Sequence, residues 1–153
     1  MKKFNLTFLF SFLAIALYAQ DSYMEIVRST IKNEKKVLIA EVMQFTDEES
    51  LAFWPVYNEF DEKLYKINTD YYNIVKDFAD NFENMSAEKA TDIINKASKY
   101  DLAREKLKSK YSKKIMKVIS PQKTLRFMQA SNKIQIMIDA QLAAEIPLLE
   151  SIE

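Results

Sequence analysis

The chain contains no glycine and only three prolines, and this shortage of turn-forming residues limits the folds that it can adopt. A sheet needs turns at most of its strand ends, and glycine is the residue that most readily takes the backbone conformations of such turns. A chain of 153 residues without glycine therefore favours few connections and long helices. We expect an all-α fold with three to four long antiparallel helices, forming an extended or curved helical hairpin or bundle.

Three short stretches mark where helices are expected to begin. Each has an apolar residue, then a serine or threonine, then an acidic or amide side chain two or three positions later, and each precedes a run with helical periodicity. The hydroxyl in such a stretch accepts a hydrogen bond from a free backbone N–H of the first helical turn. We therefore predict that Thr46, Ser86 and Ser120 are helix caps, with Pro121 at the first position of the last helix.

Apolar residues at intervals of three and four predict four helices, over residues 22–44, 47–84, 87–118 and 121–145. Pro55 falls in the third turn of the second helix, where a missing N–H favours a kink. The fourth helix is expected to bury an apolar stripe made of Leu125, Met128, Ile134, Met137, Ile138 and Leu142.

The first 20 residues are typical of a secretory signal peptide. Two lysines precede an almost wholly apolar run over residues 8–17, and Ala19 is a small residue suited to a cleavage site. We predict cleavage after Ala19 or Gln20, which leaves residues 21–153 as a single helical domain in the periplasm or outside the cell. A retained anchor is the alternative, although the run is shorter than the ~20 residues that span a bilayer. We expect no stable membrane insertion after cleavage.

The residue types exclude most catalytic and metal chemistry. The chain has no histidine and no cysteine, so it has no triad built on either residue and no Cys/His zinc site. Without glycine it has no glycine-rich phosphate loop. The chain after residue 20 carries 20 basic and 22 acidic residues, and this balance gives no general attraction to nucleic acid or an anionic membrane. We predict a protein that is not an enzyme, with no catalytic residue, cofactor, metal or nucleic-acid partner.

One cluster of acids leaves an alternative open. Asp47, Glu48 and Glu49 could share a hard cation with oxygen ligands. The same residues are expected at a helix N-terminus, where the helix dipole favours negative charge. The dipole interpretation accounts for them without a metal.

Aromatic residues concentrate on the second predicted helix and suggest a surface that binds other polypeptides. The alternative is that they form the core and its edge, and spacing does not separate the two. Lysines over residues 106–123 pose a similar choice between a site for an acidic partner or lipid headgroup and a solvated helix face. They spread around the helix in the sequence pattern rather than forming one stripe. The candidate protein-binding face consists of Phe53, Trp54, Tyr57, Tyr65 and Tyr72.

The stretch over residues 42–49, followed by Phe-Trp-Pro-Val-Tyr over residues 53–57, resembles exported helical proteins of the Spy/CpxP group. That group shares a degenerate Leu-Thr-x-x-Gln motif, and residues 45–49 and 119–123 are imperfect versions of it. The resemblance implies long helices in a curved hairpin, often paired as a homodimer. It also implies a periplasmic role in envelope stress, either as an ATP-independent chaperone or as a damper of a stress sensor.

Together these features predict a non-enzymatic exported helical protein that binds other polypeptides, whether unfolded clients or an envelope protein. The alternative is a structural or regulatory partner of one specific envelope protein.

Overall fold

The computed structural model describes residues 33–149, and this range contains helices and short connections but no strand. The predicted signal peptide and the start of the first predicted helix lie outside the described residues. Contacts divide the chain into two compact units, Met1–Val42 and Met43–Glu153, which are described separately. Residues 33–43 are helical. Gln44 follows with a φ of 45°, a left-handed conformation that glycine usually takes at the end of a helix.

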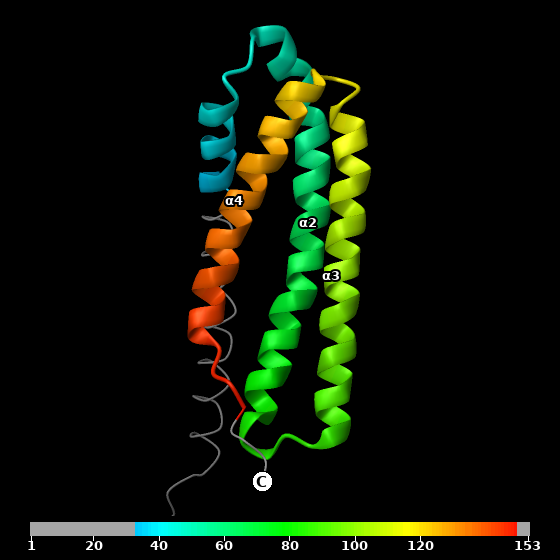
Figure 1. Ribbon diagram of the computed structural model, residues 1–153, viewed down its shortest axis with the longest axis vertical. Helices are drawn as coiled ribbons and strands as arrows, with labels where there is room; N and C mark the ends of the chain where they lie inside the picture. The colour runs from blue at the N-terminus through cyan, green and yellow to red at the C-terminus, as the bar shows by residue number, and fades with distance from the viewer. Residues whose placement is uncertain (1–32, 150–153) are drawn as a thin grey trace, which may run out of the picture. The chain divides into compact units, whose positions relative to one another are not determined.

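The second unit consists of α2 (Asp47–Asn81), a short 3₁₀ turn η1 (Phe82–Asn84), α3 (Ala87–Ile115) and α4 (Pro121–Glu145). Figure 1 shows α2 and α3 as an antiparallel pair lying side by side, with α4 returning antiparallel to α3. The expected all-α fold of long helices is confirmed. None of the described helices is both long and apolar enough to cross a membrane.

The three helices of this unit begin at hydroxyl residues. Thr46, Ser86 and Ser120 are the N-caps, and each hydroxyl accepts a hydrogen bond from the backbone N–H three residues later, at 3.1–3.2 Å. A carboxylate oxygen of Glu49 in turn accepts from the Thr46 backbone N–H at 3.0 Å, which completes a capping box. Pro121 occupies the first turn of α4, where its missing N–H is no loss.

The end of α3 differs from the prediction. The helix was expected to continue to Val118, but it ends at Ile115. The Lys117 and Val118 N–H groups donate to carbonyls three residues back, at 3.1 and 2.9 Å, so the chain tightens into a turn. The residue before a proline avoids the helical conformation, so Ser120 must be extended and the helix has to end before it.

The core of the unit is mostly aromatic. Phe60 of α2 meets Tyr111 of α3 with ring centroids 5.5 Å apart, and Tyr71 stacks on Tyr100 at 4.7 Å. From α4, the 1 % exposed Phe127 inserts its ring against α2. Its centroid lies 5.3, 6.0 and 6.2 Å from those of Phe53, Tyr57 and Phe60.

The face that α4 buries was predicted only in part. Met128, Ile134 and Ile138 of the expected stripe are half-buried. Leu125 and Met137 were expected to point inward, but they are 60 % and 72 % exposed, whereas Thr124 and Phe127 are buried. Apolar residues occur around most of α4, so their spacing does not select one face. The large ring of Phe127 selects it by filling the space beside α2.

Candidate functional site

The predicted protein-binding face does not form one exposed surface. Phe53 and Tyr57 are 0 % and 1 % exposed, so both belong to the core and cannot contact a partner in this conformation. Trp54, Tyr65 and Tyr72 are half-buried. Their intervals of eleven and seven residues place these three on one flank of α2.

Trp54 is held from two sides. Its indole N–H donates to the Ser50 hydroxyl at 2.9 Å, one helical turn back. Its ring lies edge-on to those of Phe45, Phe53 and Tyr57, with centroids 6.2, 5.2 and 5.3 Å away. These contacts make Trp54 the rim of the aromatic core rather than the centre of a separate face.

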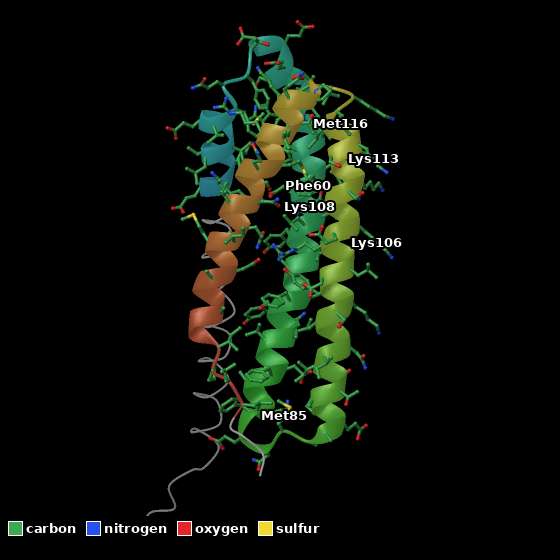
Figure 2. The ribbon with its side chains drawn as sticks, viewed as in Figure 1. Phe60, Met85, Lys106, Lys108, Lys113 and Met116 are labelled. Atoms are coloured by element: carbon green, nitrogen blue, oxygen red, sulfur yellow. The ribbon has the colours of Figure 1, made fainter. Side chains whose placement is uncertain are left out.

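A cleft of about 230 Å³ lies where α2, α3 and α4 meet. Buried rings and aliphatic side chains from all three helices line its apolar part, and polar side chains of α3 and α4 line the remainder. Figure 2 labels Phe60 and Lys108 on the side of α2 and α3 that faces α4. The apolar lining consists of Phe60, Leu64, Tyr111, Phe127, Met128 and Ile136.

An ordered polar network spans the cleft from α3 to α4. The Arg104 guanidinium donates to the Tyr100 hydroxyl at 3.0 Å and to one oxygen of Asp139 at 3.1 Å. The other Asp139 oxygen accepts from the Gln135 amide at 2.7 Å. Burial opposes the charge on Arg104, but the Tyr100 oxygen and the Asp139 carboxylate hold the pKa of Arg104 above its usual value. Arg104 therefore stays charged while it connects the two helices.

The cleft also carries Lys108, whose ammonium lies 3.4 Å from the Glu105 carboxylate outside the lining. The lining thus holds two cations, Arg104 and Lys108, and one carboxylate, Asp139. This composition suits a ligand that brings an apolar side chain together with a negative charge.

The core contains two buried tyrosine hydroxyls that are not suited to act as nucleophiles. The side-chain oxygens of Tyr57 and Tyr111 are buried without a hydrogen-bond partner. Burial, followed by the neighbouring Glu59 carboxylate, raises the pKa of Tyr111 to about 12. Burial and then the charge of Asp61 also raise the pKa of Tyr57. Both hydroxyls stay protonated at neutral pH, so neither is activated as a nucleophile.

The acids of the described residues form no metal site. Within residues 33–149 there is no group of three or more acidic side chains arranged to hold an ion. Glu49 of the predicted acidic cluster instead belongs to the capping box of α2 and pairs with Lys123 of α4. The Lys123 ammonium and then the Thr46 N–H hold the pKa of Glu49 below its usual range.

Sequence reasoning missed the residues that build the cleft. Phe127 carried a usable signal, because it is the one aromatic residue of α4 and large rings usually decide which face is buried. Arg104 and Asp139 carried none, since they are 35 positions apart and neither belongs to a motif.

No protein-family model, curated protein or solved structure matches the chain.

Proposed function

We propose that this protein is a non-enzymatic exported helical protein that binds other polypeptides, and that the cleft between α3 and α4 receives an apolar side chain of the bound chain. One observation carries the proposal. The cleft has a floor of buried rings, yet its wall includes Ile136, which is 66 % exposed. Apolar surface that is open to water beside an ordered polar network is typical of a protein-binding site.

The arrangement of α4 supports the proposal. The backbones of α2 and α3 run close together along their length, whereas α4 approaches only α3 closely and over a short stretch. Figure 1 shows α4 diverging from the pair toward its C-terminal end. A helix attached in this way can adjust its distance from α3 at lower cost than a fully packed helix. Such adjustment suits a site that takes side chains of different size.

The residue types at the cleft support it further. Met128 contributes a flexible, polarisable side chain, and methionine is common at surfaces that accept varied partners. The resemblance to the Spy/CpxP group leads to the same function, and it adds the periplasm and envelope stress as the setting. The proposed role is therefore that of an ATP-independent chaperone or envelope-stress factor.

The test is suppression of client aggregation by the exported protein without nucleotide. Ile136→Glu places a carboxylate in the cleft wall at an exposed position, so it should change the free energy of unfolding by less than about 0.5 kcal/mol. We expect it to weaken protection roughly fivefold or more, as for a residue at the centre of an interface. Leu51→Glu is the matched control, because Leu51 is 80 % exposed on α2 and lies outside the cleft.

The result separates the proposed roles. Protection of several unrelated clients that is lost in Ile136→Glu and kept in Leu51→Glu supports a general chaperone. Stoichiometric binding of one envelope protein with the same pattern supports a regulatory partner. Equal activity of Ile136→Glu and the unchanged protein overturns the assignment to the cleft.

A further inference from the structure

The lysines of α3 divide into two sets once their contacts are known. Those of the first set lie within 3.4 Å of carboxylates: Lys89, Lys96, Lys108 and Lys114. Those of the second set are exposed and make no ion pair with any residue that the structure describes. The second set consists of Lys99, Lys106, Lys110 and Lys113, together with Lys117 in the following turn, and is called the lysine stripe below.

The lysine stripe lies on one face of α3. Its members within α3 follow at intervals of seven, four and three residues, which a helix of 3.6 residues per turn places nearly above one another. The residues that α3 buries, such as Leu107 and Tyr111, fall on a different side. Figure 2 shows Lys106 and Lys113 on the outer side of α3, away from α4. The sequence pattern had suggested that these lysines spread around the helix, because it did not separate the paired ones.

No acid interrupts the lysine stripe. The residues that share its face between Lys99 and Lys113 are Leu102, Ala103 and Ser109. Leu102 is an apolar side chain that is 54 % exposed. From Lys99 to Lys113 the helix extends about 21 Å, so several ammonium groups lie along a straight, exposed line.

We infer that the lysine stripe docks this protein on an anionic lipid bilayer, with α3 parallel to the membrane surface. A straight row on the outer side of one helix fits a flat surface with dispersed negative charge. Lysine suits such a surface, because its ammonium is a point charge without the fixed two-bond geometry by which arginine recognises one carboxylate. Leu102 adds an apolar contact at the level of the headgroups.

The bilayer is favoured over an acidic polypeptide by the form of the surface. The cleft at Arg104 and Asp139 contains no member of the stripe, and of the stripe only Lys117, at its end, lines the second cleft, beside Ser120. Lys99, Lys106, Lys110 and Lys113 lie outside both clefts, so neither cleft would fix the path of a chain along them. The near balance of charge in the whole protein adds little attraction of its own. Attraction that is confined to one face therefore orients the protein on the membrane and keeps the cleft, on the other side of α3, open to polypeptides.

The test is binding of the full chain to vesicles, measured by sedimentation. Vesicles of phosphatidylglycerol mixed with phosphatidylcholine are compared with vesicles of phosphatidylcholine alone. The lysine variants compared below share the N-terminal segment with its Lys2 and Lys3, so the comparison between these variants removes the contribution of that segment to binding. Each lysine near an anionic surface strengthens binding roughly fivefold, so Lys106→Gln/Lys110→Gln/Lys113→Gln should weaken it roughly a hundredfold. Binding should also fall steeply as salt rises, because the Debye length shortens.

The matched control is Lys66→Gln/Lys76→Gln/Lys133→Gln, which removes the same charge from exposed positions on α2 and α4. Glutamine keeps the helix propensity of lysine, and circular dichroism verifies that both variants are folded. The inference stands if the stripe variant loses the charge-dependent binding and the control keeps it. Equal loss in both variants would show that net charge alone acts, and equal binding to both kinds of vesicle would exclude headgroup recognition. Tighter binding to polyglutamate than to anionic vesicles would make the partner an acidic polypeptide. Each of these last three results overturns the inference.

Discussion

Side chains of α2 contact side chains of α3 along most of the length of the two helices. Glu59 meets Lys114 at 2.8 Å near one end, and Asp77 meets Lys89 and Lys96 at 3.0 and 3.1 Å near the other. Ring pairs fill the interval between them. The contact of α4 with this pair is built differently, from a few separate attachments and a cleft between them.

Besides the ion pair of Lys123 with Glu49 at its start, two attachments hold α4 along its length. Phe127 inserts among the rings of α2, and Asp139 pairs with Arg104 twelve residues further on. The α2–α3 contact distributes its energy over many side chains, so no single one decides whether it forms. The contact of α4 concentrates its energy, and loss of one side chain should release much of the helix.

The largest effect is expected for Phe127→Ala. Phe127 is fully buried, so its removal should lower the free energy of unfolding by roughly 3–5 kcal/mol. Leu125→Ala is the control on the same helix at a 60 % exposed position, and it should stay within about 0.5 kcal/mol. Urea unfolding gives the energies, and amide hydrogen exchange shows where protection is lost. Loss spread evenly over α2, α3 and α4 would contradict the contrast between the two contacts.

A smaller effect is expected for Trp54→Ala, which tests how far the attachment of α4 extends. Trp54 is half-buried at the rim of the rings that receive Phe127, so we expect a loss of about 2 kcal/mol, less than for a fully buried tryptophan. Ser50→Ala removes only the hydrogen bond to the indole and should cost about 1 kcal/mol. Urea melts of both variants measure these values. A Trp54→Ala protein as stable as the unchanged one would place this side chain outside the attachment.

Much of this arrangement follows from local patterns in the sequence. The caps at Thr46, Ser86 and Ser120 need only a hydroxyl and the backbone beside it, so short-range spacing was enough to find them. The stripe of α2 could be predicted because Phe53, Tyr57, Phe60 and Leu64 repeat with a clear period. The cleft could not, because it depends on how far α4 stands from α3.

The same limit applies to the candidate surfaces. The exposure of an aromatic residue depends on which helix covers it. The period of α2 placed Phe53 and Tyr57 on its apolar stripe, but it did not show whether another helix or a binding partner covers that part of the stripe. Likewise, the lysine stripe becomes visible only after lysines such as Lys114 are assigned to carboxylates on another helix.

Tyr111→Phe removes a buried hydroxyl that has no hydrogen-bond partner. At neutral pH the variant should be as stable as the unchanged protein or up to about 1 kcal/mol more stable, because no bond is lost and a buried polar group is removed. The effect should grow in alkali. The pKa of Tyr111 is raised from 10.0 to about 12 in the folded protein. The unfolded chain therefore loses this proton at a lower pH than the folded chain does. As a result, the unchanged protein loses stability as the pH rises from 10 toward 12.

Urea midpoints between neutral pH and pH 12 measure this difference, with Tyr72→Phe, a half-buried tyrosine of α2, as the control. The variant Tyr111→Phe should lose less stability in this window than either the unchanged protein or the control. Identical alkaline profiles for all three proteins would show that the Tyr111 hydroxyl is not held in an apolar environment.

The smallest effect is expected for Asp77→Asn, which removes both ion pairs at the end of the α2–α3 contact. Hydrogen bonds from Lys89 and then Lys96 hold the pKa of Asp77 below its usual range. Its contribution is therefore present above about pH 4 and is lost as the pH falls through the lowered pKa. Exposed pairs stabilise little, so the variant should differ slightly at neutral pH and not at all in strong acid.

Urea midpoints as a function of pH follow this convergence. Asp101→Asn, which removes an exposed acid of the same helix pair, is the matched control. A large loss in Asp77→Asn at neutral pH would mean that the α2–α3 contact also depends on single attachments.

The carboxylate of Glu49 links two helix starts that lie far apart in the chain. It completes the capping box of α2, and it pairs with Lys123, whose own backbone N–H is bound by the cap of α4. Fraying of the first turn of either helix must therefore break a bond that the other one uses. The two ends should open and close as a single cooperative unit, although more than 70 residues separate Thr46 from Ser120.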